Sequence, residues 1–328
     1  MPRQQVVGPD EAGMRLDRWF RLHFPALTHG RLEKLLRTGQ VRIDGGRTKA
    51  SLRLEAGQMV RIPPPVTADA SPPPPRRDKP PAVDDELAAQ LAGRILYRDR
   101  HILALAKPAG LAVQGGSKTS RHLDGALGGL RFGADDAPRL VHRLDKDTGG
   151  VLLLARDRKT AAELTAAFRG RAVRKIYWAL VTGNPRPEAG RINVGLHKVS
   201  GGQGQRVVAS DDGKRAVSLY RTEARAGGRA TWLSLMPLSG RTHQLRVHCQ
   251  AMGHPVVGDG KYGGRQAFLG DPVAGRLHLH ARAIEIPRPG GALRISAPLD
   301  GHMLETWRFL GFEAEPKEDP FAAFEGQN

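Results

Sequence analysis

An α+β fold, in two domains joined by a linker, is predicted by three features of this 328-residue chain. Residues 93–315 alternate short apolar runs with amphipathic helical stretches, a pattern typical of a mixed, largely antiparallel sheet with flanking helices. Residues 1–65 have the pattern of a small helix–helix–strand unit. Between them, SPPPPRRDKPP holds six prolines in eleven residues and disfavours both helix and sheet. We therefore assign 66–92 as a Pro-rich linker and 316–328 as a disordered tail.

The first domain begins with two predicted helices. Apolar residues at Leu16, Trp19 and Phe20 have helical spacing, and Pro25 ends that helix. Thr28 is suited to cap a second helix, which Gly39 stops. The second helix has an apolar face of Leu32, Leu35 and Leu36.

A basic flank and a β-hairpin complete this domain. Arg31, Lys34 and Arg37 are three residues apart, so they share one side of the second helix. A solvated charged face is the common reading of such a run, and contact with nucleic acid is the alternative. QVRIDGGRTK predicts a strand, a Gly-Gly turn and a second strand, and GQMVRIPPP predicts a closing strand.

The second domain contains a series of strands and one clear helix. RILYRDRHILALAKPAGLAV predicts two strands with a turn between them, and VLLLAR predicts a buried strand. DRKTAAELTAAFRG predicts a helix with Ala161, Leu164 and Phe168 facing inward and Gly170 at its end. Further strands are predicted for RKIYWALVTG, AVSLYRTEA, RATWLSLMPL and LHLHARAIEIP.

Composition narrows the functional class. The formal net charge of +18 indicates a polyanionic partner. Cys249 is the single cysteine, so no internal disulfide can form, as expected in a reducing compartment. The N-terminus has no signal-peptide pattern, and no apolar run approaches the roughly 18 residues of a membrane span. We expect a cytoplasmic protein without a membrane partner, and a monomer because no coiled-coil repeat is present.

The stretch VHRLDKDTGG, residues 141–150, places a carboxylate among basic groups directly before a buried strand. Asp147 fits a turn former, because an aspartate before Thr-Gly-Gly can bond neighbouring amides. Asp145 lies beside apolar residues, so it needs a cationic or hydrogen-bonding partner. His142 and Arg143 belong to the same cluster and are candidates for contact with a substrate, although spacing alone does not make Arg143 that partner.

Two further segments carry candidate site residues. In SGRTHQLRVHCQAMGHPVVGD, residues 239–259, Thr242 can cap a helix whose apolar stripe flanks Arg246, and a half-buried arginine implies an anion. In RKIYWALVTG, Tyr177 and Trp178 point to opposite faces of the strand, one toward the core and the other toward a possible cleft.

Metal and cofactor sites are not supported by the motifs. His243 and His248 are five residues apart, which places them on different faces of a helix, and CxxC and HExxH patterns are absent from the sequence. G-x-x-x-x-G-K-[ST], a G-x-G-x-x-G placed between a strand and a helix, and G-x-S-x-G are also absent. We predict neither a metal nor a cofactor.

Four blocks in a fixed order resemble the RluA/RluC family of large-subunit (23S) ribosomal RNA pseudouridine synthases. They are RILYRDRHILALAKPAGLAVQGG, HRLDKDTGGVLLLAR, RKIYWALVTG and SGRTHQLRVHCQAMGHPVVGD. The AVQGGS stretch and the spacing are most similar to the type C branch, whereas Gln114 and GDGKYGG depart from it. Residues 14–62 resemble the S4 RNA-binding domain.

The resemblance implies a fold, a substrate and roles for individual residues. It implies a catalytic domain of mixed, largely antiparallel sheet acting on ribosomal RNA. Asp145 falls on the family's catalytic aspartate, Tyr177 on the tyrosine that stacks on the target base, and Arg246 on the basic residue that pairs with the aspartate. Leu245 falls on an apolar wall, and Arg143 on the arginine that replaces the flipped base.

The reaction that the resemblance implies needs no cofactor. It breaks the bond between N1 of the uracil and C1′ of the ribose and joins C5 of the uracil to C1′ instead. Arg246 beside Asp145 would hold that carboxylate ionised. Two alternatives stay open: an N-glycosidase that uses Asp145 and Asp147 on RNA, and an inert S4-domain factor that binds ribosomal RNA.

Overall fold

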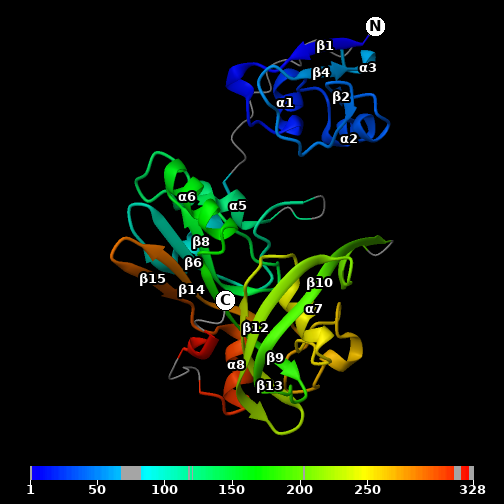
Figure 1. The fold of residues 1–328 in the computed structure, drawn as a ribbon. Coiled ribbons are helices and arrows are strands. Elements are labelled where there is room, and N and C mark those ends of the chain that lie inside the picture. Colours follow the sequence, from blue (N-terminus) through cyan, green and yellow to red (C-terminus); the bar gives the residue numbers. More distant parts are fainter. Residues whose placement is uncertain are drawn as a thin grey trace. The chain divides into compact units, whose positions relative to one another are not determined.

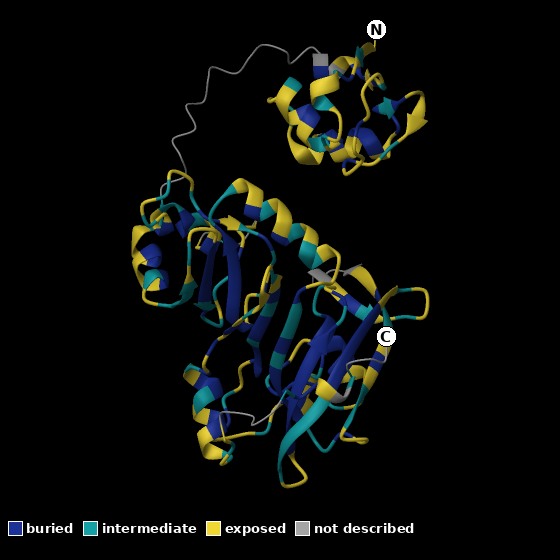
Figure 2. Cartoon of the chain, turned by 60° about the vertical axis from the view of Figure 1, so that its left-hand side comes forward, coloured by how far each residue is buried: buried dark blue, intermediate teal, exposed yellow. Residues whose placement is uncertain are grey.

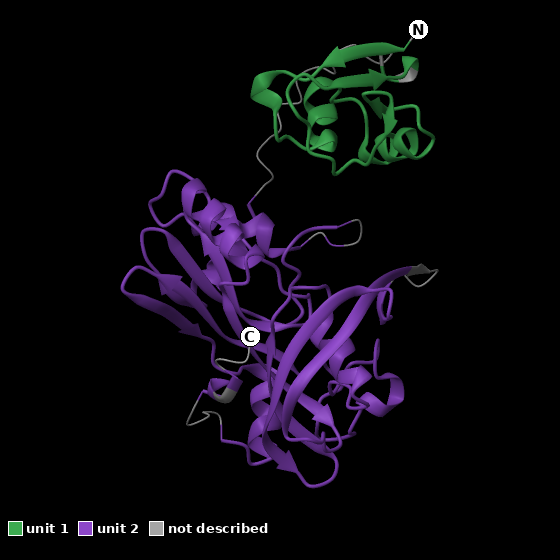
Figure 3. Ribbon diagram, in the orientation of Figure 1, with its two compact units in different colours: residues 1–80 green, residues 81–328 purple. Residues whose placement is uncertain are grey.

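The computed structural model describes residues 2–67, 83–116, 119, 121–201, 204–313 and 319–324. The chain divides into two compact units, Met1–Pro80 and Pro81–Asn328 (Figure 3). Each unit has an apolar core of its own, and each is described by itself. The proline-rich run at 71–81, which the sequence predicts to be a linker, lies outside the described residues.

The first unit combines an antiparallel four-stranded sheet with two helices. Across the sheet the strands follow the order β1 (Arg3–Val6), β4 (Met59–Ile62), β2 (Arg42–Ile43) and β3 (Gly46–Arg47). Helices α1 (Leu16–His23) and α2 (His29–Arg37) bury Trp19, Phe20 and the predicted leucines in one core. The short helices η1 (Pro9–Glu11) and α3 (Pro64–Thr67) flank it.

Several local predictions for this unit are confirmed. The Thr28 side chain accepts a hydrogen bond from the backbone N–H of Arg31 and so caps α2. Gly39 follows α2 with φ +69°, the left-handed conformation that ends a helix. Arg31, Lys34 and Arg37 are exposed, while the three leucines between them are buried.

Two details of this unit differ from the predictions. The hairpin turn is Asp44-Gly45 rather than Gly-Gly, because both central residues of this tight turn have positive φ, 47° and 78°, and aspartate tolerates that conformation. Strand β1 was not predicted: RQQV lacks alternating apolar residues and pairs with β4 through its backbone at the sheet edge.

The second unit is built on one 11-stranded sheet (Figure 1). The strand order along it is β11-β10-β12-β13-β9-β14-β8-β6-β5, with β15 paired to β14 and β7 to β8. The bounds are β5 (Ile95–Arg98), β6 (Ile102–Lys107), β7 (Arg139–Leu140), β8 (Gly149–Ala155), β9 (Arg174–Thr182), β10 (Ala189–Gly201), β11 (Gly204–Ala209), β12 (Lys214–Ala226), β13 (Ala230–Pro237), β14 (Leu279–Arg288) and β15 (Gly291–Ser296).

Among the described strand pairs, β14–β8 runs parallel and the others run antiparallel, which confirms the predicted mixed sheet. Figure 2 shows the strands of this sheet buried over much of their length, with the exposed residues gathered on helices and loops. The unit's helices are α4 (Asp85–Ala92), α5 (Leu123–Ala126), η2 (Leu127–Leu130), α6 (Arg158–Arg169), α7 (Gln244–Ala251), η3 (Gly264–Ala267), α8 (Gly301–Phe309) and η4 (Ala322–Phe324).

The predicted linker at 66–92 is too long. Residues 85–92 form helix α4, capped by the Asp84 side chain, and bury Leu87, Ala88 and Leu91 in one cluster with the β6 leucines. The predicted linker extends beyond the prolines that indicate it and includes DELAAQLA. That segment has good helix formers and an N-terminal cap, which favour a helix. Helix α4 therefore belongs to the second unit.

The predicted disordered tail is wrong for residues 319–324. Asp319 Oδ1 accepts a hydrogen bond from Arg174 Nη2 of β9 at 2.6 Å. The Phe321 side chain is fully buried beside Ile176, Leu219 and Met236. The polar, proline-containing sequence is typical of a disordered tail. Asp319 and Phe321 are ordered by partners that are distant in the chain, which local sequence does not reveal.

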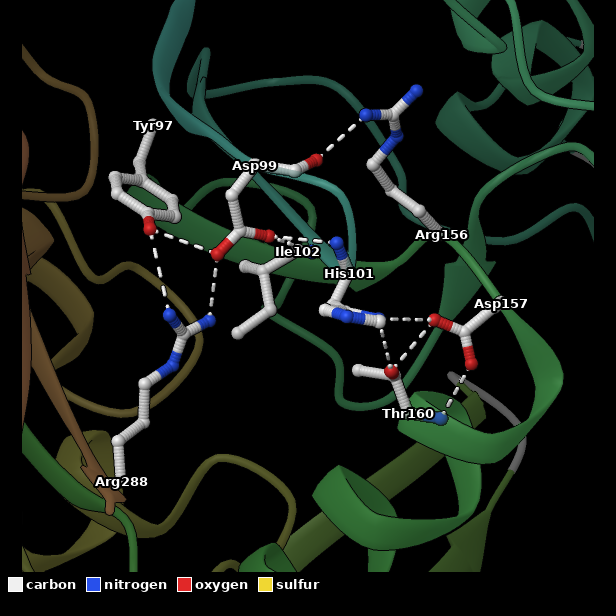
Figure 4. A network of polar contacts seen from close by, with 8 residues as sticks. All are labelled: Tyr97, Asp99, His101, Ile102, Arg156, Asp157, Thr160 and Arg288. Carbon is white, nitrogen blue, oxygen red and sulfur yellow. Dashed lines mark hydrogen bonds and ion pairs between the residues drawn. The ribbon is translucent and has the colours of Figure 1, made fainter.

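A polar network ties the turn between β5 and β6 to β14 and α6 (Figure 4). Asp99 accepts hydrogen bonds from the backbone of Ile102 at 2.6 Å, from the Tyr97 hydroxyl at 2.8 Å and from Arg288 at 2.9 Å. Although burial opposes it, these bonds lower the pKa of Asp99 to about 2. On the other side, His101 contacts Asp157, the residue that caps α6.

Over the part of the chain that the structure describes, no helix has the length and apolarity needed to traverse a lipid bilayer.

Replacing Phe321 tests whether the C-terminal segment belongs to the fold. We expect Phe321→Ala to lower the free energy of unfolding by about 3 kcal/mol, because it empties a fully buried site. Urea denaturation measures this change. Phe309→Ala is the matched control: its side chain is 59% exposed, so the expected change is within about 0.5 kcal/mol. Equal effects of the two substitutions would contradict the described packing.

Candidate active site

Asp145 lies on the loop between β7 and β8, and the backbone of this loop is held from both sides. The Thr148 N–H donates to the Asp145 carbonyl at 3.2 Å, and the Gly110 N–H donates to the Lys146 carbonyl at 2.9 Å. The Asp145 carboxylate keeps 30% of its surface exposed. The loop is thus rigid while its carboxylate stays accessible to a ligand.

The buried side chain of Lys107 holds the backbone of the Asp145 loop and of the segment that follows β6. The Lys107 ammonium donates to the carbonyls of Pro108, Leu111 and Lys146 at 2.9, 2.8 and 3.0 Å. Burial lowers the pKa of Lys107 to about 8, against the opposing charges of Asp147 and Asp145. Lys107 is not among the residues predicted from the sequence, where its one signal is that a lysine ends the apolar run ILALAK.

Gly150 allows the strand behind the loop to reach its neighbour. It has φ +106°, and a Cβ there would lie 2.2 Å from the Ala281 carbonyl oxygen of β14. No side chain fits at that distance. The TGG sequence after Asp145 therefore serves the close approach of β8 to β14, as well as the turn.

Tyr177 and Trp178 occupy opposite faces of β9, as predicted. Trp178 packs edge-on against Trp232 in the core, with ring centroids 4.7 Å apart. Tyr177 lines a cavity together with Asp145 and Leu245. Burial first, and the charge of Asp145 second, raise the pKa of the Tyr177 phenol, so the hydroxyl stays protonated at neutral pH.

Arg246 has a different direct partner from the one that the resemblance implied. Its Nε and Nη2 each donate to the Asp259 carboxylate at 2.6 Å, in a two-bond fork. Asp259 is fully buried, so it requires a fixed cation more strongly than the partly exposed Asp145 does. Burial opposes it, but the Asp259 carboxylate first, and the charge of Asp145 after it, raise the pKa of Arg246.

The start of α7 also differs from the prediction. The helix begins at Gln244, and the residue at its N-terminal cap is His243 in the left-handed conformation, not Thr242. His243 Nδ1 lies 2.6 Å from the Tyr262 hydroxyl, and its Nε2 lies 3.9 Å from Asp145 Oδ1. The sequence offers His243 only as a candidate metal ligand, because its neighbour Tyr262 is distant in the chain.

Of the remaining predicted residues, Leu245 and Arg143 line the cavity beside Tyr177, with Leu245 buried and Arg143 exposed. His142 also reaches the lining, but its Nε2 accepts the Leu153 N–H at 2.8 Å and its ring stacks on Phe168. Burial lowers the pKa of His142 to about 3, so the ring is neutral. It stabilises the loop, and contact with substrate stays a prediction.

Asp145 lies where two cavities meet. The larger, about 670 Å³, contains Tyr177, Leu245 and Arg143; the other, about 480 Å³, contains Lys261 and Arg276. The side chains that both cavities share are Asp145, Lys146, His243 and Arg246. Within the described ranges, no group of three or more His, Cys, Asp or Glu side chains is placed to bind a metal ion.

Replacing Arg246 by lysine tests the fork with Asp259. Lysine keeps the charge but makes a single bond to the buried carboxylate, so we expect a loss of about 2 kcal/mol in the free energy of unfolding. Chemical denaturation measures it, and Arg265→Lys on the exposed η3 serves as the control. A stability equal to wild type would show that the second bond contributes nothing.

The comparisons with known proteins agree with this geometry. The model of the RNA pseudouridylate synthase family matches residues 101–251. Ribosomal large subunit pseudouridine synthase C of Salmonella typhimurium is 38% identical over 93% of this chain and 95% of that protein. The synthase C of Escherichia coli K12 is 39% identical over 90% of this chain and 92% of that protein. The synthase C of Vibrio cholerae is 37% identical over 90% of this chain and 93% of that protein.

Two solved structures share the catalytic fold. Human RNA pseudouridylate synthase domain containing 4 superposes with a TM-score of 0.58 at 27% identity, over 70% of this chain and 97% of that one. Human RNA pseudouridylate synthase domain containing 1 superposes with a TM-score of 0.51 at 27% identity, over 68% of this chain and 96% of that one. Sequence relatives that span nearly the whole chain, and a shared sheet, lead to one conclusion: this chain belongs to the RNA pseudouridylate synthase family.

Proposed function

We propose that this protein isomerises specific uridines of large-subunit (23S) ribosomal RNA to pseudouridine, with Asp145 as the catalytic carboxylate. One observation carries the proposal: Asp145 lies in a cavity where Tyr177 of β9 and Leu245 and Arg246 of α7 converge beside it. The ribosomal substrate is supported by the relatives of 37–39% identity, which are large-subunit synthases.

The proposed chemistry breaks the N1–C1′ bond of uridine and joins C5 to C1′. The Asp145 carboxylate acts at the sugar, either as a nucleophile on C1′ or as a base. The protonated Tyr177 ring stacks on the uracil, and buried Leu245 forms the wall beside it. Arg246, held by Asp259, contributes a fixed positive charge near the reacting carboxylate.

The target uridine must leave its stack to enter the cavity, at a cost of a few kcal/mol. Arg143 is exposed at the cavity and two residues from Asp145, so its side chain is positioned to fill the space that the base leaves. Loops and bulges of RNA are the expected targets, because their bases are most easily extruded.

The N-terminal unit is proposed to be an S4-like RNA-binding domain. Its α2 presents Arg31, Lys34 and Arg37 on an exposed flank, and the net charge of +18 supports a polyanionic partner. We further propose that the protein acts as a monomer in the cytoplasm.

Asp145→Asn tests the catalytic assignment. We expect pseudouridine formation to fall by roughly 10⁴-fold or more, as when a catalytic nucleophile is removed, while RNA binding is retained. The assay is incubation with 23S ribosomal RNA transcribed in vitro, followed by carbodiimide-blocked primer extension. Asp147→Asn is the matched control and should keep activity.

Retained turnover by Asp145→Asn would refute the assignment. Release of free uracil by the wild type would indicate an N-glycosidase instead. RNA binding without any modification by the wild type would favour an inert binding factor.

Replacing Arg31, Lys34 and Arg37 together by glutamine tests the role of α2. If each contacts a phosphate, the slope of log affinity against log salt falls by roughly 2, at about 0.7 per phosphate. Filter binding at several salt concentrations measures the slope. Glu33→Gln on the same helix is the control, and an unchanged slope in the triple variant would place the RNA elsewhere.

A further inference from the structure

His243 is a polar side chain of the site to which the roles above assign nothing. It lines both cavities, and its two ring nitrogens face different groups. Nδ1 lies 2.6 Å from the Tyr262 hydroxyl. Nε2 lies 3.9 Å from Oδ1 of Asp145, the residue at which the two cavities meet. A separation of 3.9 Å is too long for a hydrogen bond, so Nε2 is available to a ligand that enters beside Asp145.

We propose that His243 is the base that removes the C5 proton of the uracil after the base has been reattached to the ribose. This inference rests on the proposed isomerisation and adds a catalytic residue to it. It assigns the last proton transfer to a group other than Asp145 and Tyr177.

The proton balance of the reaction requires such a base. When C5 bonds to C1′, C5 carries both the sugar and its original hydrogen, while N1 has lost its bond to the sugar. The C5 proton must leave and N1 must gain one, so the net change is zero and no oxidant is required. In the proposal His243 Nε2 takes the proton from C5, and N1 receives one from the resulting imidazolium or from water.

The surroundings of His243 prepare it for this step. Burial first, and the charges of Arg246 and Lys261, lower its pKa, whereas Asp145 and Asp259 act in the opposite direction. The ring is therefore neutral before reaction and has one nitrogen with a free lone pair. The proposal places the ring hydrogen on Nδ1, donated to the Tyr262 hydroxyl, which leaves Nε2 as the acceptor.

Tyr262 is itself held in place, so the ring of His243 cannot turn freely. The backbone N–H of Tyr262 donates to Asp259 Oδ1 at 3.2 Å, and its ring lies 4.9 Å below the Arg246 guanidinium. The Val207 N–H donates to its hydroxyl at 3.3 Å. The buried fork of Arg246 and Asp259 thus positions the base through Tyr262.

Asp145 can assist the same step. The aspartate is a free carboxylate once C5 has bonded to C1′, whether it acted earlier as nucleophile or as base. An imidazolium at His243 would then face an anion about 4 Å away, which stabilises it.

The backbone of His243 suggests two informative variants. Its φ of 53° lies in the left-handed region, which asparagine tolerates and glycine adopts without strain. His243→Asn keeps a polar group near Tyr262 but removes the base. His243→Gly removes the side chain and leaves room for a small molecule.

The first experiment compares wild type, His243→Asn and the exposed-site control His197→Asn on 23S ribosomal RNA transcribed with either 5-protio or 5-deuterio uridine. General-base catalysis is worth 10²–10⁴-fold, so we expect pseudouridine formation by His243→Asn to slow by on the order of 10²-fold or more. Deuterium at C5 should slow the variant further, by a larger factor than in wild type, because proton removal becomes rate-limiting.

The second experiment adds imidazole to His243→Gly. Restored turnover that rises with the concentration of neutral imidazole is expected, and failure of any rescue in a folded variant would overturn the base role. A wild-type rate in His243→Asn, or a slow rate without an increased isotope effect, would also overturn it. Absence of pseudouridine with the wild type itself would instead refute the proposed function, so the two failures are distinguishable.

Discussion

The buried pair of Arg246 and Asp259 is the interaction on which the site depends. Asp259 is fully buried and Arg246 nearly so, and two bonds of 2.6 Å join them. Removing charge from water is costly, so such a pair persists only where both partners are well bonded. The fork holds α7 against the segment that carries Tyr262, and thereby sets the positions of His243 and Leu245, which both closely precede Arg246 in the chain.

The sheet supplies the second constraint. Strands β8 and β14 run parallel at the place where the loop that carries Asp145 enters β8, and β9, which carries Tyr177, pairs with the other edge of β14. This arrangement brings a loop residue and a strand residue, 32 positions apart in the sequence, to one cavity. It requires Gly150, since any side chain there would meet the backbone of β14.

The positive charge of the chain has two separate uses. Inside the second unit, the buried cations are bonded to protein atoms: Lys107 to three carbonyls and Arg246 to Asp259. These groups shape the site. Exposed cations such as Arg143 at the cavity and those on α2 face solvent, where they are positioned to meet phosphate.

The α+β class, the positions of most strands along the chain, the caps of α2, and Asp145, Tyr177 and Leu245 as residues of one site could be predicted from the sequence. These features are local, or follow from ordered motifs with a known family. The folded chain shows three features that the sequence does not predict: Arg246 bonds to Asp259, His243 faces Asp145, and α4 and residues 319–324 pack into the catalytic unit. Each depends on side chains that meet only when distant segments fold together, and burial then selects the partner, because a charge removed from water takes the nearest group able to satisfy it.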